Sequence, residues 1–253
     1  MKVSFKSVFI ISMLVISTQV LVSCGIEDYP IIYPIPQSNV QQVMNNRSVV
    51  RIPDDNSGTT FDHFAIYYKI YLSNSDQPST TSDASYSTIS SLLSSEHNAA
   101  RSHIDSTSYV SVNMDSFFTG RGFYQINLDD HNLSQVLSSS VFGSTLEFDF
   151  PSRRAPTMTV GSSVYTLWRS TGNGRFSPQP DRRFVNSDEL RNPANIDPEI
   201  NADVVDIPGS GSGVKRYTYA AFYIVAVGIN TATYSFIYST PALIHVFQLP
   251  DRW

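Results

Sequence analysis

YTYAAFYIVAV, at residues 217–227, is the stretch that decides the fold. Apolar or aromatic residues occupy both its odd and its even positions, so neither face of a strand built from it is suited to water. Such residues fit a pleated sheet, and a strand that is dry on both faces lies in the interior of a sheet. The stretch therefore predicts a central strand that is covered on both sides.

Other strand patterns surround this one. Residues 64–72 alternate strictly, which predicts a strand with one dry face. Pro241 marks the last predicted strand as an edge strand. Aromatic residues make up 12% of the chain and charged residues only 15%, so composition also predicts a mainly β protein. The remaining segments with apolar or alternating runs that predict strands are 48–52, 146–150, 164–168 and 234–247.

The connecting segments predict turns and loops. Residues 53–58 are rich in Asp, Asn and Gly, which predicts a turn, and the glycines at 172–174 predict a hairpin after the strand at 164–168. Residues 73–82 and 177–213 are rich in Ser, Pro or Gly and show no clear periodicity, which predicts loops.

One longer helix is predicted within this layout. Asp83 can cap a helix whose apolar residues recur at helical spacing and which ends near His97 or His103. Residues 48–253 are then expected to form a single β-sandwich domain. An insertion at about 73–216 would contain the helix.

The N-terminus has the features of an export signal. Lys2 and Lys6 precede an apolar run at residues 8–16, and a basic start before roughly 7–15 apolar residues is typical of a secretory signal. The run is shorter than the stretch of about 20 apolar residues that spans a bilayer as a helix. LVSC follows at residues 21–24 and resembles the bacterial lipobox: an aliphatic residue, a tolerant position, a small residue and a cysteine.

Cys24 is the lipid attachment site that this resemblance implies, and the chain has no other cysteine. A lipobox implies a diacylglyceryl thioether on Cys24, removal of the signal peptide (1–23), and acylation of the new amino terminus, with palmitate as a typical acyl chain. Gly25 stands where lipoproteins of the inner membrane often carry aspartate, which favours the outer membrane without indicating which face. The alternative interpretation is an ordinary signal peptide followed by an incidental cysteine.

Processing before Cys24 would leave an acidic chain with a lipidated tether. The two lysines of the signal are lost, so the formal net charge changes from −5 to −7, with 15 basic and 22 acidic residues remaining. An acidic surface argues against nucleic acid as a partner. Residues 24–47 contain three prolines, which predicts an extended tether that leads into a first edge strand.

Several segments together resemble the fibronectin type III sandwich, an immunoglobulin-like fold. Ile52 departs from that family, which has a core tryptophan at this position, and Ala220 stands where it has a corner tyrosine, with Tyr219 only adjacent. In layout the chain also resembles uncharacterised spirochaetal lipoproteins, a likeness that implies no activity. The segments that resemble the second, third, sixth and last strands of the fibronectin family are 49–53, 64–69, 220–227 and 238–246.

Histidines offer few candidate metal ligands. His97 and His103 are six residues apart, whereas two ligands on one helix face need a spacing of four. Residues 129–131, Asp-Asp-His, are typical of a turn or a helix start, and His63 and His245 lie in predicted strands, where histidines are usually structural. We therefore predict no metal site and no other cofactor.

An acidic segment leaves one alternative open. Calcium binds six to eight oxygen atoms, and this segment places oxygen-bearing side chains at alternating positions. Ile200 stands where an EF-hand loop needs glycine, so a solvated acidic loop is the competing interpretation. The side chains concerned are Asn195, Asp197, Glu199, Asn201 and Asp203.

No motif predicts catalysis. Residues 212–215 fit the Ser-x-x-Lys pattern of penicillin-binding enzymes, but the companion motifs that position a base do not occur. The paired carboxylates at 54–55 and 188–189 fall in predicted turns, where solvation accounts for them. The sequence contains neither a phosphate-binding Gly-x-x-x-x-Gly-Lys loop nor a Gly-x-Ser-x-Gly elbow.

The predicted function is that of a membrane-anchored exported lipoprotein with a non-catalytic surface module that binds protein or glycan. Loops cluster at the ends of a sandwich, and binding often resides there. Tyr165, Trp168 and Phe176 could add to a contact face, although aromatic residues on strands more often belong to the core. Two alternatives are a structural protein of the cell envelope and an exported hydrolase with a site beside the 73–216 insertion.

Overall fold

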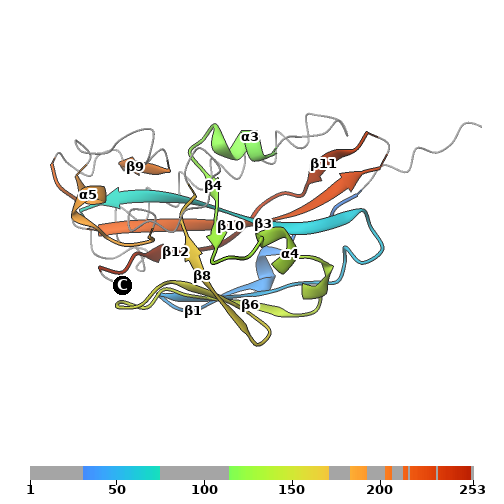
Figure 1. Ribbon diagram of the computed structural model, residues 1–253, viewed down its shortest axis with the longest axis horizontal. Coiled ribbons are helices and arrows are strands. Elements are labelled where there is room, and N and C mark those ends of the chain that lie inside the picture. Colours follow the sequence, from blue (N-terminus) through green and yellow to red (C-terminus); the bar gives the residue numbers. More distant parts are fainter. Residues whose placement is uncertain are drawn as a thin grey trace, which may run out of the picture.

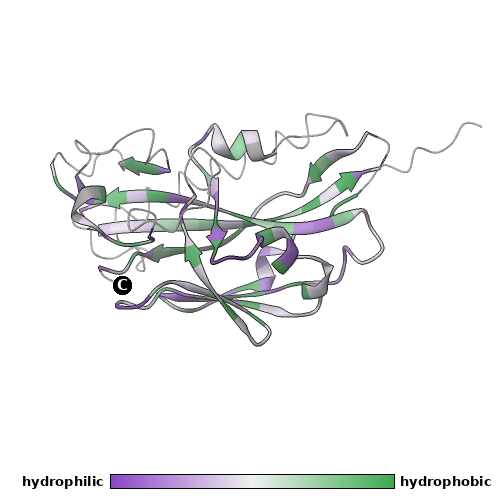
Figure 2. Ribbon diagram, in the orientation of Figure 1, coloured by the Kyte–Doolittle hydropathy of each residue, from purple (hydrophilic) through white to green (hydrophobic). Residues whose placement is uncertain are grey.

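The protein is mainly β, as the sequence predicts. The computed structural model describes residues 31–74, 114–170, 183–192, 203–206, 213–215, 217–231 and 233–251. Within these ranges two sheets pack face to face (Figure 1). Hydrophobic residues recur along the strands of both sheets (Figure 2).

The first sheet contains six antiparallel strands in the described part of the chain. Their order is β1 (Val40–Met44), β2 (Arg47–Arg51), β6 (Thr145–Asp149), β7 (Thr157–Val160), β8 (Ser163–Trp168) and β5 (Asn127–Leu128). β1 lies at an edge, as predicted. β8 forms a hairpin with the preceding strand β7 through Gly161, whose φ is +60°. The hairpin predicted at 172–174 lies outside the described residues.

The second sheet is built around the predicted central strand, β10 (Tyr217–Asn230). It pairs with β3 (Phe61–Ser73) on one side and, on the other, with β11 (Ser235–Tyr238) and then β12 (Ala242–Gln248). β4 (Tyr124–Gln125) pairs antiparallel with β3, and β9 (Val204–Asp206) pairs parallel with it. Pro241 lies between β11 and β12, so the last predicted strand is an edge strand in two pieces.

The two sheets form the predicted β-sandwich. β1, β2 and β6 belong to one sheet, and β3, β10 and β12 to the other, which is the strand grouping of immunoglobulin-type sandwiches. Ile52, which replaces the core tryptophan of the fibronectin family, is 2% exposed. Phe150 stacks on Phe247 with ring centroids 4.1 Å apart, and Phe222 lies 5.2 Å from Phe150. These three rings are part of an aromatic core between the sheets that also contains Phe148 and Phe184.

A change of sheet links the two layers on one side. β4 pairs with β3, and after Ile126 the chain continues as β5, which pairs with β8. The Ile126 N–H donates to the Ile66 carbonyl at 3.0 Å, so the crossing itself is bonded to β3. Toward the other edge, the Ser48 hydroxyl of β2 donates to the Ile244 carbonyl of β12 at 3.1 Å. Hydrogen bonds therefore connect the sheets near both edges.

The prediction that β3 has one dry face is wrong, because both of its faces are buried. Phe64, Ile66 and Tyr68 face the sandwich core, while Tyr67 and Tyr71 belong to a second apolar cluster on the outer face. Helix α3 (Met114–Thr119) and the turn after it cover that outer face, as Figure 1 shows above β3 and β10. The alternation was read correctly, but the pattern cannot reveal a second covering layer.

The helix-containing insertion predicted at 73–216 is not shown by the described residues. The described residues of this range supply β4 to β9, so much of it belongs to the sheets themselves. The helix predicted from Asp83 to His97 or His103 lies outside the described residues, and within them no helix has the length and apolarity to cross a membrane. The other short helices are η1 (Gln37–Asn39), α4 (Leu133–Val136), η2 (Ser139–Val141) and α5 (Asp188–Arg191).

Gly228 lets the N-terminal segment cross over β10. A Cβ atom at this position would lie 2.4 Å from Cδ1 of Ile32 and 2.8 Å from the carbonyl oxygen of Thr60. We expect Gly228→Ala to lower the free energy of unfolding by about 1–3 kcal/mol, because the added methyl group would overpack the core at this point. Urea unfolding measures the change. The double variant with Ile32→Ala should lose less than the sum of the two single variants, and simple additivity would contradict this explanation.

Candidate functional site

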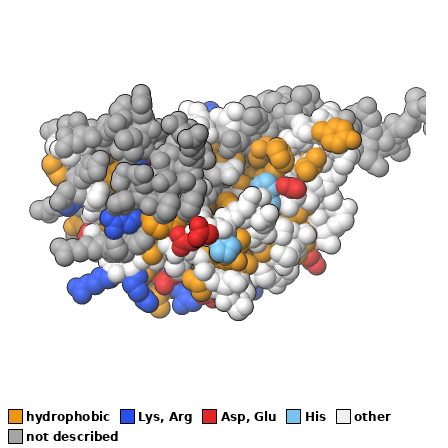
Figure 3. Space-filling model, viewed as in Figure 1, with side chains coloured by type: hydrophobic (Ala, Val, Ile, Leu, Met, Phe, Trp, Pro, Cys, Tyr) orange, Lys and Arg blue, Asp and Glu red, His pale blue; other side chains and the backbone are white. Residues whose placement is uncertain are grey.

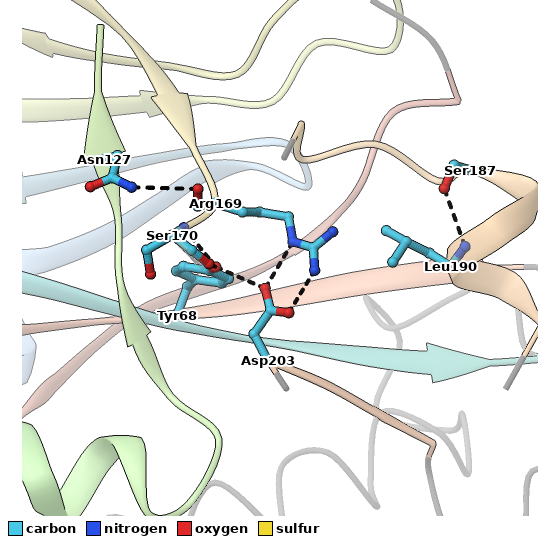
Figure 4. Close-up of polar contacts among 7 residues, drawn as sticks. All are labelled: Tyr68, Asn127, Arg169, Ser170, Ser187, Leu190 and Asp203. Atoms are coloured by element: carbon cyan, nitrogen blue, oxygen red, sulfur yellow. Dashed lines mark hydrogen bonds and ion pairs between the residues drawn. The ribbon is translucent and has the colours of Figure 1, made fainter. Parts of the chain in front are cut away.

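A buried ion pair joins β8, β9 and β3 (Figure 4). Arg169 follows β8, Asp203 precedes β9, and they are 3% and 2% exposed. The Arg169 guanidinium donates from Nε to Oδ2 of Asp203 at 2.8 Å and from Nη2 to Oδ1 at 2.6 Å. The Tyr68 hydroxyl donates to Oδ2 at 2.8 Å and accepts from the Ser170 N–H at 3.0 Å. Both oxygens of the carboxylate are therefore held by protein groups.

This geometry corrects both interpretations of Asp203. The residue neither lies in a solvated loop nor presents its oxygens to calcium, because it is buried against Arg169 and Tyr68. The other four positions of the acidic segment lie outside the described residues. Burial of Arg169 by itself would lower its pKa, but the charge and hydrogen bonds of Asp203 outweigh that effect and raise the pKa above its ordinary value. The pair is a charged, structural link.

Tyr68 completes the link as a hydrogen-bond donor. Burial first, and then the neighbouring charge of Asp203, raise the pKa of its hydroxyl well above the ordinary value. The hydroxyl therefore keeps its proton at neutral pH and continues to donate to the carboxylate. Because Tyr68, Arg169 and Asp203 are all closed off from solvent, they position strands rather than contact a ligand.

A first groove opens on the outer face of the second sheet, between α4 and β11. We call it the α4–β11 groove, and its volume is about 410 Å³. Its floor is a row across three paired strands, with His63 on β3, Val227 on β10 and Tyr238 on β11. Its lining residues are His63, Gln125, Asn132, Leu133, Ser134, Val227, Phe236 and Tyr238.

A second groove lies on the other side of α4, toward β7 and β8. This α4–β8 groove has a volume of about 480 Å³ and is lined mainly by polar side chains, including Gln135, Ser140 and Ser144. The rings of His131 and Tyr165 meet edge to face in it, 5.0 Å apart. Figure 3 shows histidine, acidic and hydrophobic side chains close together on this face of the molecule.

Helix α4 is the wall between the two grooves. Asn132 caps it, since its Oδ1 accepts from the Ser134 N–H at 3.0 Å and from the Ser134 hydroxyl at 2.8 Å. The Leu137 carbonyl at the end of α4 accepts from the Phe64 N–H at 2.9 Å, which ties the helix to β3. Asn132 lines both grooves. The cap therefore fixes the orientation of side chains on both sides of the helix.

The α4–β11 groove contains a histidine, a carboxylate neighbour and a serine, but they do not form a hydrolytic triad. His63 Nδ1 lies 2.7 Å from Oδ2 of Asp62. The Ser134 hydroxyl, however, donates a hydrogen bond to Oδ1 of Asn132 rather than to His63. A nucleophilic serine needs a base that accepts its proton. The three side chains are therefore not arranged for nucleophilic attack by Ser134.

The other described residues that the sequence offered as candidate metal ligands or catalytic groups do not lie together in the structure. His63 and His131 line different grooves, and His245 lies on β12 with its Nε2 3.3 Å from the Asn45 carbonyl oxygen. No group of three potential metal ligands occurs among the described residues. Cys24, His97, His103, Phe176 and Ser212 lie outside them. Lys215, the last residue of the Ser-x-x-Lys pattern, is buried at 1% exposure.

Tyr165 and Trp168, mentioned from the sequence as possible contact residues, have different positions. Tyr165 lines the α4–β8 groove, and the Trp168 indole N–H donates to the Asp129 carboxylate. Sequence reasoning missed Gln125, Ser134 and Phe236. A signal existed only for Phe236, which alternates with Tyr234 and Tyr238 in the sequence.

His245 should make stability depend on pH. Burial lowers the pKa of this histidine, and the Asn45 carbonyl opposes the shift in part. Because the unfolded chain takes up the proton more readily, stability is complete above about pH 6.5 and declines as the pH falls below that value. We expect His245→Gln, which keeps an N–H donor, to lose less stability than the wild type between pH 7 and pH 5 in urea unfolding. Equal losses would contradict the assignment.

Comparisons of the chain with protein-family models, with curated proteins and with solved structures find no match.

Proposed function

We propose that this protein is an exported lipoprotein, held to a membrane by lipid on Cys24, whose β-sandwich is a non-catalytic binding module. The lipobox at residues 21–24 supports the anchor. We also propose that the membrane is the outer membrane, and that the protein is related to the uncharacterised spirochaetal lipoproteins. The observation that carries the binding role is the pair of grooves on either side of α4.

The linings of these grooves favour binding over chemistry. Each combines aromatic rings with amide and hydroxyl groups, which is typical of sites that recognise a ligand by shape and hydrogen bonds. Their volumes of about 410 and 480 Å³ fall in the range of small-ligand sites. Paired strands and a capped helix hold the lining residues, so little ordering is needed when a ligand binds.

Mass spectrometry of the native protein tests the anchor. The mature chain should begin at Cys24 and carry three acyl chains. A free thiol, or a mature end at any other residue, would remove the basis for a lipid anchor.

Site-directed photo-cross-linking tests the binding role. A photoreactive amino acid at position 134, inside the α4–β11 groove, should give a discrete adduct in intact cell envelopes. The same amino acid at position 152, an exposed turn between β6 and β7, is the matched control and should give none. Absence of an adduct at 134, or equal adducts at both positions, would overturn the assignment of this groove. A fixed-stoichiometry complex that forms without contact at 134 would favour a structural envelope protein instead.

A further inference from the structure

Aromatic side chains form one wall of the α4–β11 groove. Phe236 and Tyr238 occupy alternating positions of β11, so their side chains lie on one face of this strand, whereas Tyr234 lies in the turn that precedes it. The ring centroids of Phe236 and Tyr238 are 6.5 Å apart. Phe236 is 50% exposed and Tyr234 is 87% exposed. The strand thus presents two rings to the groove, and Tyr234 lies exposed at the hairpin tip.

Tyr234 has an unfavourable backbone conformation at the hairpin tip. Its φ is +53°, in the left-handed region that bulky residues rarely adopt. Its N–H donates to the Asn230 carbonyl at 2.7 Å, which holds the turn in place. Glycine or asparagine would fit this position with less strain, and strain of this kind is concentrated at functional sites. The exposed ring is therefore kept at a cost in stability.

The opposite wall of the groove is polar, and hydrogen bonds to the protein fix the orientation of its amide groups. Nε2 of Gln125 donates to the Tyr67 hydroxyl at 3.1 Å, which fixes the plane of the amide. Oδ1 of Asn132 is used by the helix cap, so the Nδ2 group is the part of this amide that can bond to a ligand. The side chains on this wall can therefore offer hydrogen bonds in fixed directions.

The charge of the lining limits the ligand. Among the described residues that line the groove there is no Lys, Arg, Asp or Glu, and His63 already faces the carboxylate of Asp62. An anion would find no cation to balance it here, and a cation would find only the carboxylate that His63 engages. The groove is suited to an uncharged ligand with an apolar face and hydroxyl groups along its edges.

We propose that the α4–β11 groove binds an uncharged glycan of one or two pyranose rings. The C–H face of the sugar would pack on Phe236 and Tyr238, and its hydroxyl groups would bond to Gln125 and Asn132. A volume of about 410 Å³ accommodates a ligand of this size. This inference rests on the proposed function and names the ligand class of the same groove.

Saturation-transfer NMR on the full-length lipidated protein tests the proposal. The protein is held in a detergent without a sugar headgroup and probed with cellobiose, maltose, lactose and N,N′-diacetylchitobiose. At least one disaccharide should receive saturation at its ring C–H protons, with a Kd of about 1 mM or tighter. No transfer to any of the four would overturn the proposal.

Substitutions locate the binding. Phe236→Ala should weaken it at least about fivefold, because one stacking surface is lost. Phe236→Trp keeps an aromatic face and should retain binding, and it remains informative if the alanine variant folds poorly. Val164→Ala, at an exposed apolar residue on β8 outside both grooves, is the matched control and should bind as the wild type does. Unchanged binding in Phe236→Ala would place the sugar elsewhere.

The two proposals can fail separately. If position 134 cross-links to a protein and no disaccharide binds, the glycan inference is wrong and the proposal of a binding module is supported. If there is neither an adduct at position 134 nor binding of a disaccharide, both proposals are wrong.

Discussion

Arg169→Met should lower the free energy of unfolding by about 3–5 kcal/mol, as expected when a buried charge loses its partner. The substitution removes the two hydrogen bonds that the guanidinium donates to Asp203, and among the described residues it leaves the carboxylate with the Tyr68 hydroxyl as its side-chain partner. Asp203 is 2% exposed, so water cannot replace the lost partner. Urea or thermal unfolding followed by circular dichroism measures the loss.

The double variant Arg169→Met/Asp203→Asn separates charge from packing. It removes both charges and keeps a side-chain oxygen that accepts from Tyr68, so it should recover most of the stability. Arg47→Met is the matched control, because the Arg47–Glu147 ion pair has side chains 41% and 40% exposed. Water screens that pair, and its loss should change stability far less. If the double variant were as unstable as Arg169→Met, the unpaired charge would not be the cause.

Cys24→Ala should abolish lipid attachment. The thioether needs the sulfur of Cys24, so a clickable palmitate analogue fed to the cells should label the wild type and leave the variant at background. One acyl chain binds a membrane only marginally, with an association constant of about 10⁴ M⁻¹, but each buried CH₂ adds about 0.8 kcal/mol. Three chains on Cys24 would therefore hold the protein to the membrane almost permanently, so we expect label in the wild type and none in Cys24→Ala.

Ser23→Ala is the control for this experiment. It keeps a small residue before Cys24, so the lipobox pattern survives and labelling should continue. Label that persists in Cys24→Ala would mean that lipid is attached at another residue. An unlabelled wild type would mean that the signal belongs to an ordinary secreted protein.

The longer strands were predictable because local alternation records which faces are buried. Segments predicted at 48–52, 146–150 and 164–168 correspond to β2, β6 and β8, with bounds that differ by one residue. β4, β5 and β9 contain two or three residues each, too few to show a period. These short strands were therefore not predicted, and of the strands in the described part of 73–216 only β6 and β8 match predicted ones.

The candidate site was predictable only in fragments. Arg169 and Asp203 are separated by 34 residues, and Tyr68 lies 135 residues before Asp203. No local pattern marks such partners. The α4–β11 groove likewise collects side chains from β3, β4, α4 and β11, each of which looks ordinary in its own segment.

The sequence by itself determined the central strand at 217–227, the β class of the protein and the proposed lipid attachment at Cys24, because each of these depends on residues that are neighbours in the chain. Only the tertiary structure decided that β3 is covered on both faces, that Asp203 is paired rather than solvated, and that two grooves flank α4. The physical reason is that burial of a second face, compensation of a charge and the shape of a groove all depend on contacts between segments distant in sequence. Local periodicity records one face of one strand, and carries no information about what packs against it.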